Sequence, residues 1–149
     1  MNKLLNYISL ITLVTATAMV LTVTYWLVYP YNPLELKSVR VLEDEVNAGG
    51  GLTYEIEYCK NTELIATVSR AFINGVVFTT PMIITNNPPG CHKNIHQTNV
   101  PAELPSGTYS LRSIWSYQVN PIRRVSVTKT TNFFKVLGSD VDRQSDQEE

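Results

Sequence analysis

The residues best suited to chemistry surround two cysteines, Cys59 and Cys91, the only cysteines in the chain. His92 and His96 follow Cys91, and thiolate sulfur and imidazole nitrogen are ligands that zinc prefers. A lone pair of cysteines is also typical of a disulfide formed in an oxidising compartment. Because no Cys-x-x-Cys pair supports a metal, the sequence favours a disulfide between Cys59 and Cys91. A zinc site made of Cys59, Cys91, His92 and His96 remains the alternative.

Other catalytic groups are sparse. Both histidines lie in one segment, and no Gly-x-Ser-x-Gly elbow supplies the nucleophile of a hydrolase. The glycines at 49–51 lack the lysine and the following helix of a phosphate-binding loop. Glu55 and Glu57 alternate with apolar residues, which is typical of the solvated face of a strand. We therefore expect no enzymatic activity and no cofactor.

Basic residues gather near the last predicted hairpin. They are Arg112, Arg123, Arg124 and Lys129. A cluster of these side chains could contact anionic headgroups, glycan or phosphate. The alternative is an ordinary solvated basic face of a strand, and the sequence favours this alternative. Nucleic acid is not an expected partner, because residues 35–137 carry ten basic and eight acidic side chains and no aromatic stacking motif.

All of these residues follow a long uncharged segment. No charged residue lies between Lys3 and Glu35, and the intervening run is rich in Leu, Ile, Val, Ala and Thr. A bilayer core about 30 Å thick requires about 20 apolar residues in a helix, and threonine hydroxyls can bond to the helix's own carbonyls. The sequence therefore predicts a transmembrane helix over residues 4–29, with the lipid bilayer as its partner, a cytoplasmic segment at 1–3 and a linker at 30–34.

The end of this run favours an uncleaved anchor. Tyr25, Trp26 and Tyr29 suit the headgroup level, and Pro30 ends the helix. The small residues at 16–18 resemble a cleavage site, but the apolar run continues for about ten residues beyond them, too far for a signal peptide. Flanking charges do not decide the orientation. The expected disulfide does, and it places the C-terminal domain in the periplasm or outside the cell.

Residues 35–137 alternate apolar and polar side chains with turn signals between the runs, a pattern that predicts strands. Asn74-Gly75 predicts a tight hairpin with a type I′ turn. A change of apolar phase in the last strand predicts a bulge. The expected strands lie at 36–42, 52–58, 64–72, 76–84, 95–100, 109–119 and 122–136.

Residues 138–149 are acidic and almost free of apolar side chains, so we expect a disordered tail.

The segment Leu104-Pro-Ser-Gly-Thr-Tyr-Ser-Leu111 resembles the corner that opens the sixth strand of immunoglobulin-like and fibronectin-type-III-like domains. The resemblance implies an all-β, antiparallel immunoglobulin-like sandwich of about seven strands, preceded by one transmembrane helix, with Tyr109 as the corner tyrosine. The sixth strand carries Trp115 and no cysteine, so the likeness is to the architecture and not to antibodies. The whole chain is also similar to small uncharacterised phage-encoded membrane proteins.

This topology makes the second and fifth strands antiparallel neighbours, which brings Cys59 close to Cys91. It also turns Arg123, Arg124 and the Cys91 loop towards the membrane and the Tyr109 corner away from it. At Tyr54, Tyr58, Trp115 and Tyr117, the phase of the strands favours core packing over a ligand groove.

The function expected from these features is that of a membrane-anchored, non-enzymatic binding or structural module. Its setting would be a phage or bacterial envelope or a virion, with a protein as its partner. The alternative is a periplasmic chaperone or inhibitor that acts by β-strand addition. A zinc-binding or enzymatic domain is the third.

Overall fold

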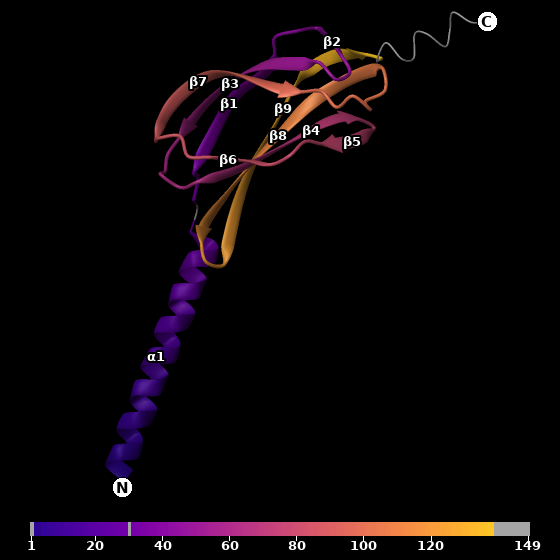
Figure 1. The fold of residues 1–149 in the computed structure, drawn as a ribbon. Coiled ribbons are helices and arrows are strands. Elements are labelled where there is room, and N and C mark those ends of the chain that lie inside the picture. The colour runs from indigo at the N-terminus through magenta and orange to yellow at the C-terminus, as the bar shows by residue number, and fades with distance from the viewer. Residues whose placement is uncertain (1, 30, 139–149) are drawn as a thin grey trace, which may run out of the picture.

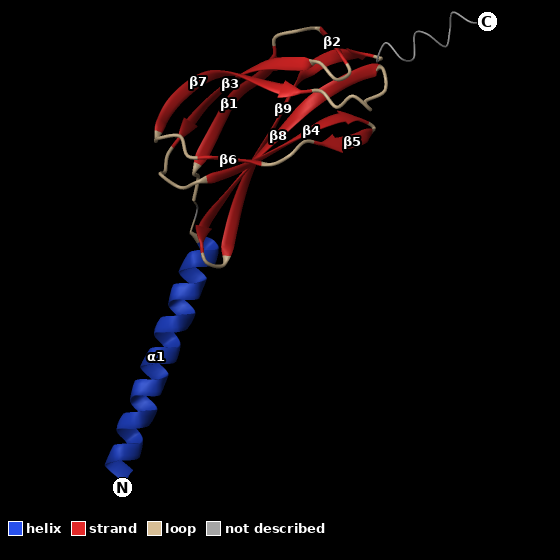
Figure 2. Cartoon of the chain, viewed as in Figure 1, coloured by secondary structure: helices blue, strands red, loops and turns tan. Residues whose placement is uncertain are grey.

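The computed structural model describes residues 2–29 and 31–138, so almost all of the predicted tail at 138–149 lies outside the described residues. One helix precedes a β domain (Figures 1 and 2). The elements are α1 (Asn2–Val28), β1 (Leu34–Val41), β2 (Glu45–Asn47), β3 (Gly51–Lys60), β4 (Ala66–Asn74), β5 (Val76–Thr79), β6 (Ile83–Thr85), β7 (Gly90–Asn99), β8 (Gly107–Asn120) and β9 (Arg123–Leu137).

The α1 helix projects from one end of the β domain as a separate rod (Figure 1). Its segment Asn6–Val28 is long and apolar enough to cross a bilayer, and none of it is buried in the protein. The hydroxyls of four threonines donate to the carbonyls four residues earlier, as predicted, at distances between 2.9 and 3.0 Å. These bonds satisfy the polar side chains within the helix itself. Two predicted bounds differ slightly, because α1 ends at Val28 and β1 already begins at Leu34.

The strands form two sheets. One contains three antiparallel strands in the order β1-β3-β7, and the other has the order β2-β9-β8-β4-β5, with β6 also paired to β4. The prediction that all strands are antiparallel was wrong, because β2 runs parallel to the end of β9. Backbone hydrogen bonds to β9 just before and just after β2 hold this short strand in place. They run from Lys135 N to Asp44 O and from Ala48 N to Leu137 O.

A single core contains buried side chains from strands of both sheets and is rich in aromatic residues. The strict alternation in β3 buries Leu52, Tyr54, Ile56 and Tyr58, and β8 contributes Trp115 and Tyr117 among others. The rings of Tyr58 and Trp115 lie 5.3 Å apart between centroids. Core packing of the four predicted aromatic residues is therefore confirmed, and their large apolar surfaces make a major contribution to burial.

The predicted strand at 76–84 is in fact two strands. β5 and β6 pair in succession with β4, and the connection between them contains Pro81. Proline has no N–H to donate to a ladder, so it interrupts the pairing. The preceding hairpin forms, but not with the predicted type I′ turn. Only Gly75 has a positive φ, of 67°, whereas that turn requires a positive φ at two successive residues.

The predicted bulge in the last strand is confirmed. Ser110 pairs with Phe133, and Arg112 pairs with Thr130. Between these two pairs β8 has one residue and β9 has two, so the extra residue lies in β9. The residues in the bulge bond in two directions. Thr131 Oγ1 accepts a hydrogen bond of 3.0 Å from Leu111 N, and Asn132 Oδ1 accepts one of 2.8 Å from Val41 N. The bulge therefore links the six-stranded sheet to β1 of the other sheet.

Tyr109 lies at the corner where β8 begins, and its hydroxyl donates a 3.0 Å hydrogen bond to the Pro105 carbonyl. Tyr117 lies further along β8 on the same buried face. Its hydroxyl is buried without a hydrogen-bond partner among the described residues. Burial, with a smaller contribution from Tyr58, raises the pKa of Tyr117 to about 12.

These two tyrosines predict opposite responses to loss of the hydroxyl. Tyr109→Phe should lower the free energy of unfolding by about 0.5–1.5 kcal/mol, because a hydrogen bond is lost. Tyr117→Phe should leave it unchanged or raise it, because an unpaired buried polar group is removed. Urea unfolding of both variants measures the difference. A loss of stability in Tyr117→Phe as large as that in Tyr109→Phe would show that the Tyr117 hydroxyl is bonded in solution.

Candidate functional site

Cys59 and Cys91 form a disulfide in the structure, and they face each other directly across β3 and β7. Zinc binds thiolates, and in this structure the two sulfurs are bonded to each other, so neither is available as a zinc ligand. Within residues 2–29 and 31–138, no group of three or more His, Cys, Asp or Glu side chains is arranged to hold a metal ion.

The two histidines of the zinc alternative lie on the inner face of β7. His92 Nε2 is 2.9 Å from the Pro88 carbonyl, and the His96 ring packs 5.8 Å from that of Tyr54. Asn94 and Thr98 follow the same alternation, so all the side chains on this face of β7 are polar. β7 is also an edge strand, which pairs with β3 on one side and with no described strand on the other. Sequence reasoning placed its start at residue 95 and missed the first half, which begins at Gly90.

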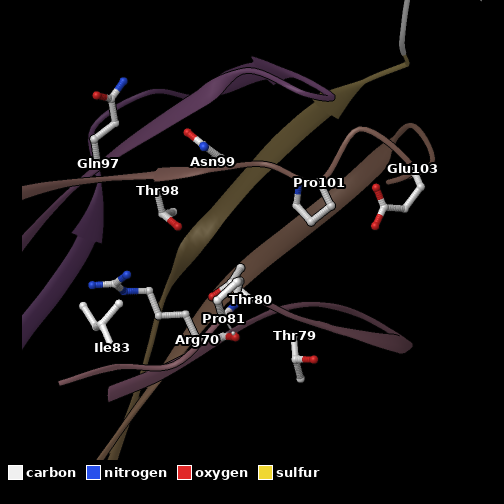
Figure 3. A pocket seen from close by; sticks show the side chains of 10 residues that line it. All are labelled: Arg70, Thr79, Thr80, Pro81, Ile83, Gln97, Thr98, Asn99, Pro101 and Glu103. Atoms are coloured by element: carbon white, nitrogen blue, oxygen red, sulfur yellow. Dashed lines mark hydrogen bonds between the residues drawn. The ribbon is translucent and has the colours of Figure 1, made fainter. Parts of the chain in front are cut away.

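A cleft of about 480 Å³ opens where the C-terminal end of β7 faces the edge of the other sheet (Figure 3). One wall is formed by residues 97–99 and the segment that follows them, and the other by β4 and the β5–β6 connection. Its charged lining residues are Arg70 and Glu103, which lie towards opposite ends of the cleft (Figure 3). The lining also contains neutral polar residues, of which Thr98 projects towards Arg70, whereas Gln97 and Asn99 project from the opposite face of β7 (Figure 3).

Arg70 is the cation of this cleft. The central carbon of its guanidinium lies 5.4 Å from the centroid of the buried Tyr54 ring, within the range of a cation–π interaction. Its backbone carbonyl accepts bonds of 2.9 and 3.3 Å from the N–H and hydroxyl of Thr80, which hold the β5–β6 connection against β4. Burial, together with the positive charge of Arg70, lowers the pKa of His96 and so favours the neutral imidazole beside the guanidinium.

Sequence reasoning missed this cleft, although the sequence contains one signal of it, the position of Arg70 in its strand. Arg70 occupies the same strand phase as Ala66, Val68 and Phe72, all of which are buried. A charged residue in the apolar phase of a strand is rare unless something compensates its charge. Glu103 gave no such signal, because it lies in a loop whose path depends on the surrounding strands.

The four predicted basic residues divide into two groups along the β8–β9 ribbon. Arg124 is paired with Gln118 and Arg123 with Asn120 at the tip, whereas Arg112 pairs with Thr130 six positions further along. At about 3.3 Å per residue, the two levels are about 20 Å apart. Lys129 lies beside Arg112 and not beside the tip. Only Arg123 and Arg124 therefore belong to the hairpin end.

That end of the ribbon meets the C-terminus of α1 (Figure 1). The Arg123 guanidinium donates to the carbonyls of Leu27 and Tyr29 at 3.1 and 2.6 Å. The Asn120 amide donates to the Trp26 carbonyl at 3.0 Å. The Trp26 carbonyl would otherwise accept from residue 30, a proline that has no N–H. The hairpin thus caps the last turn of the helix, where carbonyls lack partners and positive charge is favoured.

Arg123→Glu should release the hairpin from the helix. The substitution replaces a donor with an anion beside the negative end of the helix dipole. A loss of about 1–2 kcal/mol would increase amide hydrogen exchange at the tip about 5- to 30-fold. The measurement uses the full chain in lipid nanodiscs, with Arg112→Glu as the control for the same change of charge at a distant site. Unchanged exchange at residues 118–124 would show that the tip does not depend on this contact.

No protein-family model matches the sequence, and no curated protein matches it. Among solved structures, the chain is similar to the C-terminal domain of wzt, with a TM-score of 0.45 and 8% identity over 74% of this chain and 77% of that one. It is also similar to the Pseudomonas fluorescens alkylpurine DNA glycosylase AlkC, with a TM-score of 0.44 and 8% identity over 73% of this chain and only 32% of that one. The match to the Bacillus subtilis sporulation control protein Spo0M has a TM-score of 0.39 and 8% identity, and it covers 78% of this chain and 56% of that one. Similarities at this level identify neither a family nor an activity.

Proposed function

We propose that the chain is a membrane-anchored, non-enzymatic binding module, in which α1 holds an immunoglobulin-like sandwich outside the cytoplasm of a bacterial or phage-infected cell. The observation that carries this proposal is the contact between the β8–β9 hairpin and the end of α1. A simple tether would leave the domain free to tumble, whereas this contact gives the domain a fixed orientation relative to the helix.

The orientation leaves the cleft accessible. β7 begins opposite Lys60, and Asn61 N bonds to Pro33 O just after α1, so this end of the sheet adjoins the helix. β7 ends opposite Gly51, at the other end of the sheet, and the cleft lies there. A partner approaching the membrane from outside would therefore meet the cleft first. The Cys59–Cys91 disulfide supports an oxidising compartment on that side of the membrane.

Site-specific photocrosslinking of the intact chain in its host membrane tests this function. A photoreactive residue in place of the exposed Thr79, in the wall of the cleft, should capture one defined protein. The same residue in place of the exposed Lys129, on the ribbon away from the cleft, should not capture it. Equal capture at both positions, or capture at neither, would contradict a binding role for this end of the domain.

Capture of extended chains by β-strand addition is the second candidate function. The free edge of β7 favours it, because its backbone groups on that side pair with no described strand and an added strand could satisfy them. Crosslinking separates the two candidates. A chaperone of this kind would capture many unfolded proteins at position 79, whereas a dedicated binding module would capture one folded partner.

A further inference from the structure

The guanidinium of Arg70 lacks an anionic partner in the described part of the chain. Every ion pair in these ranges involves other residues, so no described carboxylate lies within 4.0 Å of it. Arg70 Nε is buried and makes no hydrogen bond to the described residues. A partly buried cation with an unused donor is unfavourable unless a partner supplies the missing acceptor. The Tyr54 ring compensates part of the charge, and the Tyr54 side chain also takes part in a hydrogen bond with the guanidinium, but Tyr54 supplies no negative charge and leaves Nε without an acceptor.

The charges of the cleft select the kind of anion that fits. A guanidinium offers two parallel N–H donors, which match the two oxygens of a carboxylate or a phosphate. Arg70 is the single cation among the residues that line the cleft, and Glu103 adds a negative charge to the lining. A phosphate with about two negative charges would stay partly uncompensated by one guanidinium and would be repelled by Glu103. A carboxylate, with one charge, matches Arg70 alone.

The free edge of β7 indicates what kind of molecule would carry this carboxylate. Residues 97–99 form a wall of the cleft, and they belong to the strand whose outer edge is unpaired in the described structure. An extended peptide could pair its backbone with this edge. Thr98 of that wall, together with Thr80 opposite, offers further hydrogen-bonding groups along the path (Figure 3). A chain that ends at Arg70 would present its terminal carboxylate to the guanidinium.

We propose that the cleft binds the C-terminal carboxylate of an extended peptide, with Arg70 as the residue that recognises it. This inference rests on the proposed binding function and specifies the chemistry of the partner. Arg70 forms the charged end of the site, the edge of β7 forms its backbone-binding wall, and Glu103 disfavours more highly charged ligands.

Nuclear magnetic resonance titration of the full chain in detergent micelles tests the proposal, with the Nε–H signal of Arg70 as the readout. The probes are acetyl-Thr-Val-Thr-Val with a free carboxylate, the same peptide with a C-terminal amide, and inorganic phosphate. The acid should shift the signal in a saturable manner, and its affinity should exceed that of the amide and of phosphate at least tenfold. Equal binding of acid and amide, stronger binding of phosphate, or no saturable binding of the acid would overturn it.

Variants confirm the assignment to Arg70. Arg70→Lys keeps the charge and loses the paired donors, so the affinity for the acid should fall at least tenfold, as followed on the Thr98 amide signal. Arg112→Lys makes the same exchange at an exposed position outside the cleft and should retain full affinity. Thermal unfolding of both variants verifies that the fold is intact. Arg70→Gln is a further replacement, which removes the charge as well as the paired donors. If the partner captured from position 79 binds Arg70→Gln as well as it binds wild type, the carboxylate assignment fails while the binding function stands.

Discussion

Loss of the Cys59–Cys91 disulfide should lower the free energy of unfolding by about 3–4 kcal/mol, either through reduction or in the double variant Cys59→Ser, Cys91→Ser. The two cysteines are 32 residues apart in sequence, and their bond restricts the unfolded chain over all the residues between them. For a domain of this size, such a loss corresponds to a decrease in melting temperature of about 12–30 °C. Small domains have about 5–15 kcal/mol in total, so the loss would remove roughly a quarter to most of the stability of such a domain.

The structure predicts that loss of the disulfide should destabilise β7 before the other strands. β7 pairs only with β3 among the described strands, and its inner face contributes His92, Asn94, His96 and Thr98 in place of apolar side chains. It therefore gains little from burial of apolar surface, in contrast to β3 or β8. The covalent bond and the ladder to β3 are what hold it in place. Without the bond, β7 should open locally before the rest of the domain unfolds.

Hydrogen exchange and thermal unfolding of the full chain, with and without reductant, measure both effects. Exchange should rise strongly at residues 90–99 and only weakly in the β4–β8 ladder. The double serine variant is the control, because reductant should not change it further. If exchange rises equally in both ladders, the disulfide stabilises the domain as a whole and β7 is not its weakest strand.

The sequence predicts those parts of the fold that depend on apolar alternation. Tyr54 and Tyr58 alternate with polar residues, and they are buried as expected. The bulge in β9 was visible for the same reason, since an extra residue shifts the apolar phase. The first half of β7 was not predicted, because its inward side chains are polar and leave no apolar pattern. β2 was also missed, because three residues held by backbone bonds have almost no pattern to read.

The candidate site was harder to predict than the fold, because it depends on contacts between segments distant in the sequence. Arg70 of β4, Thr98 of β7 and Glu103 of a loop meet only after the two sheets have packed. Arg123 stood out in the sequence as part of a basic group, but its contact with the carbonyls of α1 joins residues 94 to 96 positions apart. In both cases the residue type hinted at a charged contact, and only the three-dimensional arrangement identified the contact.

Two arginines in the middle of α1 should abolish stable insertion in the membrane. Leu13 and Val14 lie near the centre of the helix and are more than half exposed to the surroundings of the protein. On insertion scales, arginine at the centre of a helix costs about 2.5–3.5 kcal/mol, so Leu13→Arg with Val14→Arg should cost about 5–7 kcal/mol. Cells that make this variant should release most of it from membranes under an alkaline carbonate wash, whereas wild type should remain in the pellet.

The matched control places the same two changes on exposed apolar residues of the β domain, as Leu42→Arg with Ile95→Arg. This control should stay in the pellet, because neither position lies in the helix. N-terminal sequencing of the membrane-bound protein completes the test, since an uncleaved helix requires the protein to begin before Leu4. A mature chain that begins after Ala18 would keep only about ten residues of the apolar run, too few to span about 30 Å of hydrocarbon. The Arg123 contact with residues 27 and 29 would then attach a short N-terminal segment to the β domain, and it would not orient the domain on a membrane.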